Sequence, residues 1–132
     1  MKRYWKTLLL LLATAALLLT ACGPQTAELE VTMTDFAFDP AEVSVPAGAE
    51  VTLTLTNDGS VEHNWVLMES GYTAEAPFNE QDQENVSFEA SVLPDETETV
   101  TFTAPSESGT YQIVCSIEGH LEAGMEGTLI VE

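Results

Sequence analysis

Three residues with metal-binding side chains follow one another at equal spacing near the C-terminal end of the chain. Cys115, His120 and Met125 stand five residues apart within the segment Tyr111–Gly127. A thiolate, an imidazole and a thioether suit copper. Two imidazoles, one thiolate and a long axial thioether form the sites that proteins use for one-electron transfer. The segment therefore predicts a copper-binding loop that lacks one imidazole.

The missing imidazole can come only from His63, because the chain has two histidines. This residue lies in the apolar run 62–67, which is typical of a strand whose geometry fixes the direction of each side chain. Each donor has an ordinary explanation when taken alone: a buried thiol, a core histidine or a packing methionine. Their combined spacing favours a single metal site made by His63, Cys115, His120 and Met125.

At these residues the chain resembles the small blue copper proteins, the cupredoxins, and most closely their auracyanin and azurin-like branch. The resemblance rests on His-Asn-Trp-Val-Leu at 63–67, Cys-x4-His-x4-Met at 115–125 and Gly-Thr-Leu-x-Val at 127–131. It covers residues 29–132, and the combination of four donors is more specific than any one motif.

The resemblance implies one type 1 copper ion bound by His63, Cys115, His120 and Met125. It implies that the Asn64 side chain bonds to the backbone at Ser116 and so supports the ligands. It also implies that an electron leaves through the second histidine, exposed at the end of the domain in a docking patch made by His120, Leu121, Ala123 and Gly124.

Short alternating strands with turn residues between them fill the chain from Leu29 onward. We predict strands at 30–34, 42–45, 51–56, 62–67, 86–90, 98–103, 110–115 and 127–131. Regular spacing of this kind predicts an all-β, Greek-key β-sandwich, which is cupredoxin-like. Residues 69–85 break the pattern and form a long surface excursion with room for a short helix. A flap, as in azurin-like proteins, and a solvated loop without a role both remain open.

The first 21 residues have the features of an export signal. Lys2, Arg3 and Lys6 precede an apolar run at 8–19 that is too short for a comfortable membrane span. The sequence Leu-Thr-Ala-Cys at 19–22 resembles the lipobox of bacterial lipoproteins, which implies that Cys22 becomes the acylated N-terminus. An ordinary signal peptide with an incidental cysteine is the alternative.

The predicted division of the chain follows from this signal. Residues 1–21 are a signal peptide with a lipobox, 22–28 are the lipidated cysteine and a short tether, and 29–132 are the cupredoxin copper-binding domain. Lipidation of Cys22 would leave Cys115 without a cysteine partner, so no disulfide is expected.

The expected mature chain is strongly acidic. Every Lys and Arg precedes Cys22, and all 22 Asp and Glu residues follow it. Like charge makes nucleic acid and anionic lipid surfaces poor partners, whereas a basic patch on another protein would be attracted and steered. Solubility or adaptation to high salt explains the same composition, and both explanations stay open.

These features predict an extracytoplasmic electron carrier, anchored through Cys22 to a bacterial membrane, periplasmic or at the cell surface. It would cycle one copper ion between Cu(II) and Cu(I). The expected partners are redox proteins such as cytochromes or membrane electron-transfer complexes, basic at the docking site, and a monomer is expected. An enzyme with a second copper centre would need further histidines, so enzymatic activity is not expected. A copper chaperone or storage lipoprotein is the alternative, because export, acylation and soft ligands suit it equally.

Overall fold

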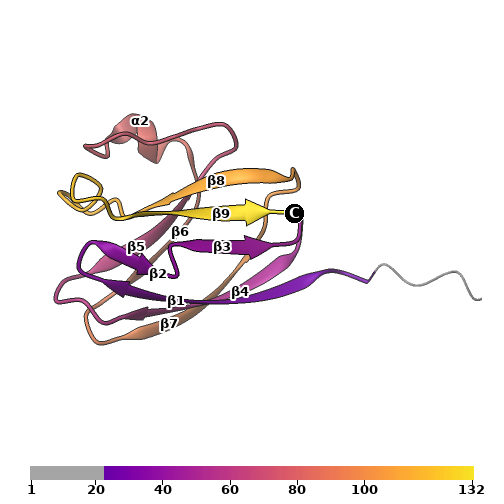
Figure 1. Cartoon of the computed structure of the whole chain (residues 1–132), viewed down its shortest axis with the longest axis horizontal. Helices are drawn as coiled ribbons and strands as arrows, with labels where there is room; N and C mark the ends of the chain where they lie inside the picture. Colours follow the sequence, from indigo (N-terminus) through magenta and orange to yellow (C-terminus); the bar gives the residue numbers. More distant parts are fainter. Residues whose placement is uncertain (1–22) are drawn as a thin grey trace, which may run out of the picture.

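The chain folds into two β-sheets that pack face to face (Figure 1). The computed structural model describes residues 23–132. The all-β sandwich predicted from the sequence is therefore confirmed.

The first sheet contains four strands in the order β2-β1-β4-β7. β1 runs parallel to β4, and the other neighbours are antiparallel. The strands are β1 Thr26–Thr34, β2 Ala37–Asp39, β4 Glu50–Asn57 and β7 Thr97–Thr103.

The second sheet contains five strands in the order β3-β9-β8-β5-β6. β3 runs parallel to β9, and the remaining pairs are antiparallel. The strands are β3 Glu42–Val45, β5 His63–Met68, β6 Val86–Val92, β8 Gly109–Val114 and β9 Glu126–Val131.

β1 begins at Thr26, so the tether predicted over 22–28 is wrong for its last residues. Thr26 pairs with Glu50, whose N–H donates to the carbonyl of Gln25 at 3.0 Å. Because β1 pairs in parallel with the long strand β4, the polar residues that follow Thr26 are part of the sheet. Cys22 and the predicted signal peptide over 1–21 lie outside the described residues.

The main core lies between the two sheets. Alternate side chains of each strand point into it, as the two-residue period of a strand requires; in β4 these are Val51, Leu53 and Leu55. Cys115 and Met125 belong to the same buried cluster. The core therefore extends to the end of the sandwich at which the predicted donors lie.

A second apolar cluster lies on the outer face of the five-stranded sheet. β5 is buried along its whole length, because Val66 and Met68 face this cluster while alternate residues face the main core. The excursion over 69–85 supplies the cover, with Ala74 buried and Tyr72 and Phe78 partly buried. The segment thus has a packing role and is not a free loop.

The short helix expected in this excursion is α2, Glu80–Gln83 (Figure 1). Asn79 caps it, since its side chain accepts the N–H of Gln81 at 2.9 Å while its own N–H donates to the Asp82 carboxylate at 2.9 Å. In the part of the chain that the structure describes, no helix has the length and apolar composition needed to cross a bilayer.

Candidate metal centre

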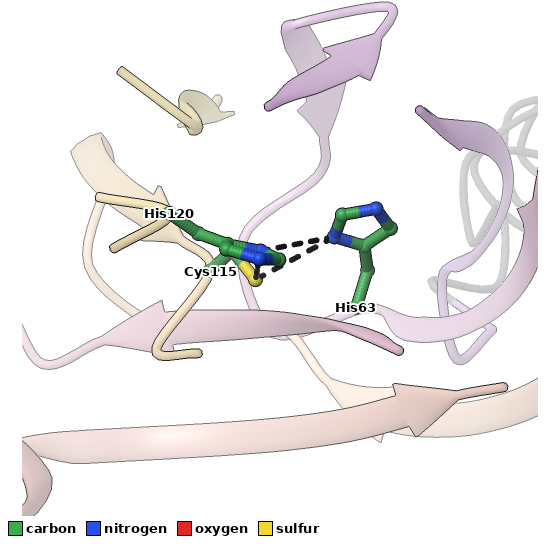
Figure 2. A group of neighbouring side chains, drawn as sticks. All are labelled: His63, Cys115 and His120. Carbon is green, nitrogen blue, oxygen red and sulfur yellow. Dashed lines mark hydrogen bonds between the residues drawn. The ribbon is translucent and has the colours of Figure 1, made fainter. Parts of the chain in front are cut away.

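His63, Cys115 and His120 meet at one end of the sandwich (Figure 2). The two Nδ1 atoms of the histidines lie 3.1 Å apart. The Sγ of Cys115 lies 3.3 Å from Nδ1 of His120 and 4.0 Å from Nδ1 of His63. All three side chains are buried. Three of the four predicted donors therefore converge in a buried site that water does not reach freely.

Two neighbouring strands bring these donors together. His63 is the first residue of β5 and Cys115 directly follows β8. Because the two strands are antiparallel, with Val66 opposite Val114, the start of β5 lies beside the end of β8. Pairing of β5 with β8 thus brings His63 next to Cys115, although the two residues are far apart in the sequence.

The loop from Cys115 to Met125 is closed by its own backbone. The N–H of Cys115 donates to the carbonyl of Met125 at 3.1 Å, and the N–H of Met125 donates to the carbonyl of His120 at 3.0 Å. The side chain of Met125 is fully buried in the main core with Cys115. The fourth predicted donor therefore lies in the same loop and on the buried side of it.

The hydrogen bond expected between Asn64 and Ser116 is present. The N–H of Ser116 donates to Oδ1 of Asn64 at 2.8 Å, and Nδ2 of Asn64 donates to Oγ of Ser116 at 2.7 Å. Nδ2 also donates to the Glu89 carboxylate at 2.9 Å. The residue after His63 is therefore fixed to the residue after Cys115.

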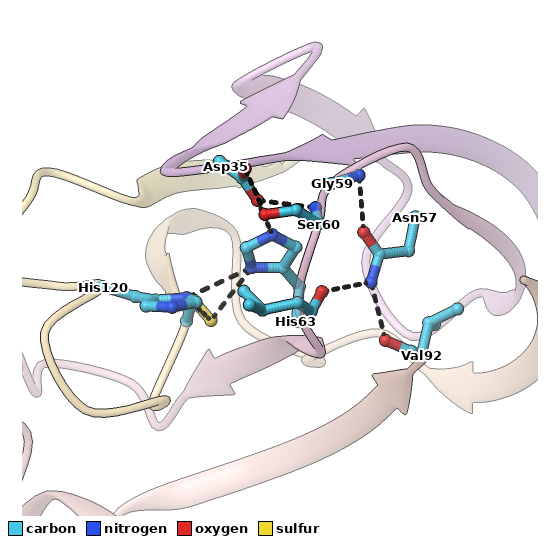
Figure 3. Close-up of polar contacts among 9 residues, drawn as sticks. Asp35, Asn57, Gly59, Ser60, His63, Val92 and His120 are labelled. Atoms are coloured by element: carbon cyan, nitrogen blue, oxygen red, sulfur yellow. Dashed lines mark hydrogen bonds and ion pairs between the residues drawn. The ribbon is translucent and has the colours of Figure 1, made fainter. Parts of the chain in front are cut away.

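A carboxylate that the sequence analysis missed contacts His63 (Figure 3). Oδ1 of Asp35, in the turn between β1 and β2, lies 3.3 Å from Nε2 of His63. The backbone N–H and the hydroxyl of Ser60 bond to the same carboxylate and lower the pKa of Asp35 from its ordinary value. Nothing in the local sequence around Asp35 signals this contact, which arises from the tertiary fold.

Asn57 organises the loop that leads to His63, and its role was also missed (Figure 3). This fully buried side chain donates to the carbonyls of Val61 and Val92, both at 2.9 Å, and accepts the N–H of Gly59 at 2.9 Å. The turn-forming sequence at 57–60 indicates a reversal of the chain, but it does not reveal these three hydrogen bonds.

Burial controls the protonation of two donors. Desolvation raises the pKa of the Cys115 thiol, and hydrogen bonds from the backbone at Asn64 and Ile117 oppose this only in part. Desolvation, followed by the neighbouring His63, lowers the pKa of His120. At neutral pH the thiol therefore keeps its proton until a metal replaces it, whereas the His120 imidazole is neutral and can act as a ligand.

His120 was expected to be exposed, but it is only 6% exposed. The predicted docking patch is also wrong at Leu121. This side chain is 7% exposed and packs in the outer cluster with Val66 and Met68, because the excursion over 69–85 covers that face of the sheet. Phe36 is instead 49% exposed, and its ring meets that of His120 edge-on, with centroids 5.3 Å apart. The exposed apolar group beside the second histidine therefore comes from the turn between β1 and β2.

The donor distances fit one metal ion. Protein ligands bind a small divalent ion at about 2.0–2.1 Å through nitrogen and about 2.3 Å through sulfur. Donors arranged around one such ion lie about 3.5 Å from one another, and the three observed separations of 3.1, 3.3 and 4.0 Å bracket that value. Two imidazoles, a thiolate and a buried thioether are the donor set of an electron-transfer copper site.

Residues 7–131 match the family described as the Cupredoxin-like domain. The chain belongs to this family. Auracyanin-A of Chloroflexus aurantiacus is 34% identical over 124 residues, which cover 83% of this cupredoxin and 75% of the relative. Auracyanin-B of the same organism is 33% identical over 123 residues, which cover 81% of this chain and 52% of the relative.

Solved structures agree with this assignment. Auracyanin A of Chloroflexus aurantiacus, described as a "blue" copper protein, superposes with a TM-score of 0.65 at 33% identity and covers 83% of this chain and 100% of its own. Dithionite-reduced auracyanin of Roseiflexus castenholzii has a TM-score of 0.66 at 28% identity, covering 83% and 99%. Family membership together with the donor set makes one type 1 copper ion the cofactor.

Copper binding to this cupredoxin should tighten as pH rises. Because burial raises the pKa of the Cys115 thiol, copper must displace the thiol proton near neutral pH. Below the thiol pKa, one displaced proton makes the apparent affinity about tenfold tighter per pH unit. His120 adds no proton release in this range, because burial lowers its pKa.

Competition titrations against a chelator of known affinity, from about pH 7 to about pH 9, measure this slope. The Cys115→Ser variant is the control, because it has no thiol proton to displace and should show a weaker slope. An affinity independent of pH in the unaltered protein would mean that the thiol is already ionised.

Proposed function

We propose that this cupredoxin is a blue copper electron carrier. His63, Cys115, His120 and Met125 are the residues that would hold the copper ion. Copper bound there would supply one-electron chemistry between Cu(II) and Cu(I). The observation that carries the proposal is the convergence of three buried donor atoms within 4.8 Å.

The surrounding residues keep the donors in place. Asn64 joins the two donor-bearing segments, and the backbone bonds of Met125 close the loop. A site whose residues are locked by packing and hydrogen bonds is preorganised. Small displacement of the ligands between the two oxidation states favours rapid transfer of an electron.

Burial of the donors also distinguishes a carrier from the other functions considered. A catalytic metal site keeps an open position for water or substrate, whereas His63, Cys115 and His120 are all buried. A chaperone or storage protein passes copper on by ligand exchange, which needs an accessible thiol. Cys115 is 0% exposed, so the chaperone alternative is not favoured.

The proposal includes an extracytoplasmic location and a lipid anchor on Cys22. Its support is the sequence at 19–22. If Cys22 is anchored, β1 carries the chain from Thr26 away from the membrane toward Asp35 and the donor cluster (Figure 1). Nine residues of strand span about 30 Å, so the copper end would face soluble partners and not the bilayer.

The proposed partners are redox proteins, cytochromes or membrane electron-transfer complexes, with a basic docking surface. Residues 23–132 contain no Lys or Arg, so the field of the domain attracts positive charge. Phe36 is the proposed apolar contact, because it is exposed and lies against His120. The domain is proposed to act as a monomer.

Changing Cys115 to Ser should abolish the intense visible absorption of the copper-loaded protein. That band requires a thiolate bonded to Cu(II), and a hydroxyl does not replace it. Absorption and electron paramagnetic resonance spectra of the Cu(II)-loaded variant measure the loss.

Met125→Leu is the matched control, because it removes the proposed thioether donor of the same buried loop. It should keep the band but shift the reduction potential, since the axial ligand tunes the potential of such sites. A Cys115→Ser variant that stays blue would contradict the proposed function.

Changing Cys22 to Ala should release the protein from membranes. Acyl chains anchor by about 0.8 kcal/mol for each buried CH₂, and residues 23–132 offer no basic patch that could bind anionic lipid instead. Fractionation of cells that express each form, followed by mass spectrometry of the N-terminal peptide, measures both attachment and acylation. Unaltered protein in the soluble extracytoplasmic fraction would contradict the anchor.

Electron transfer to a cationic cytochrome should slow by about tenfold or more as salt rises above about 0.1 M, where the Debye length falls to about 10 Å. Stopped-flow rates over a salt series measure the effect, and an anionic cytochrome, for which the dependence should reverse, is the control. A rate with the cationic partner that stays constant or rises with salt would contradict electrostatic steering. The acidic surface would then be explained by solubility or by adaptation to high salt.

A further inference from the structure

Asp35 reaches His63 from a part of the chain that supplies none of the proposed ligands. It lies in the turn between β1 and β2, and its Oδ1 is 3.3 Å from Nε2 of His63 (Figure 3). The side chain of His63 is 0% exposed and that of Asp35 is 42% exposed. A partly solvated carboxylate thus contacts the buried imidazole on the side opposite its Nδ1, which faces the donor cluster.

Ser60 holds this carboxylate in place. Its backbone N–H donates to Oδ1 of Asp35 at 2.9 Å, and its hydroxyl donates to Oδ2 at 2.8 Å. Ser60 lies in the loop between β4 and β5, just before His63. The carboxylate is therefore positioned by the same loop that leads into the histidine.

Gly59 leaves the space that this contact needs. A Cβ atom at Gly59 would lie 2.5 Å from Nε2 of His63 and 2.7 Å from Oδ1 of Asp35. Both distances are too short for any side chain, so a larger residue would push the carboxylate and the imidazole apart. The backbone at position 59 thus packs directly over the pair.

We infer that Asp35 is a positioning residue for the copper site. It accepts the Nε2–H of His63 and so holds the imidazole in the tautomer whose unprotonated Nδ1 points to Cys115 and His120. A carboxylate partner also makes a metal-bound imidazole a stronger donor. Its negative charge favours Cu(II) over Cu(I) and lowers the reduction potential. The inference rests on the proposed copper function.

Three variants separate the charge from the hydrogen bond. Asp35→Asn removes the charge but keeps an oxygen that can accept the Nε2–H. Asp35→Ala removes both. Asp58→Asn is the control, because it removes the charge of an exposed residue in the loop that contains Ser60. Retention of the blue band in each variant shows that the fold and the copper site persist.

Redox titration of the blue band should show a higher potential for Asp35→Asn than for the unaltered protein. Loss of such a partner typically weakens metal binding 10- to 100-fold. We expect the affinity for Cu(II) relative to Cu(I) to fall about tenfold, or about 59 mV for a one-electron couple. Asp58→Asn should give a much smaller shift.

Nitrogen-15 NMR of the Cu(I)-loaded protein reports the hydrogen bond itself. The Nε2–H resonance of His63 should be protected from solvent exchange in the unaltered protein and in Asp35→Asn, and should lose protection in Asp35→Ala.

Equal potential shifts in Asp35→Asn and Asp58→Asn would overturn the inference, as would a protected Nε2–H in Asp35→Ala. Those outcomes leave the blue band, and hence the proposed function, intact. A colourless Cu(II)-loaded unaltered protein would instead overturn the proposed function and this inference with it.

Discussion

The bonds between Asn64 and Ser116 are the constraint on which the metal centre depends. The backbone ladder between β5 and β8 contains only the pairs Val66–Val114 and Leu67–Ile113, so it ends before it reaches the donors. Beyond that point the Asn64 side chain, bonded to both the N–H and the hydroxyl of Ser116, continues the connection. A side chain thus replaces backbone pairing where the strands must leave room for an ion.

The domain builds its fold without cationic side chains to pair with its carboxylates. Residues 23–132 contain no Lys or Arg, yet Asp82 is buried. It accepts the hydroxyl of Tyr72 at 2.8 Å and the N–H of Asn79 at 2.9 Å, and the first of these bonds raises the pKa of Tyr72. Ser60 likewise donates its N–H and its hydroxyl to the Asp35 carboxylate. Hydrogen bonds to neutral groups depend little on ionic strength, so these two carboxylates keep their partners at low and at high salt.

Sequence reasoning succeeded where the chemistry is local or periodic. The spacing of Cys115, His120 and Met125 lies within one loop, and strand alternation predicted the sandwich. It failed where a residue acts through the tertiary fold: the contact of Asp35 with His63 crosses 28 positions and has no local signature. Leu121 was misplaced for the same reason, because its burial depends on the cover formed by 69–85, whose packing the irregular sequence did not reveal.

The closed loop from Cys115 to Met125 has a consequence for how such domains diverge. Its ends are joined by backbone bonds, from Cys115 to Met125 and from Met125 to His120, and β8 and β9 hold those ends. Ser116 and Leu121 tie the loop to the rest of the domain, through Asn64 and through the outer cluster. Exchanges at the exposed positions 122–124 can therefore vary the surface beside the ion without altering the pairing of the sheets, whereas the buried part of the loop is bound to the sandwich.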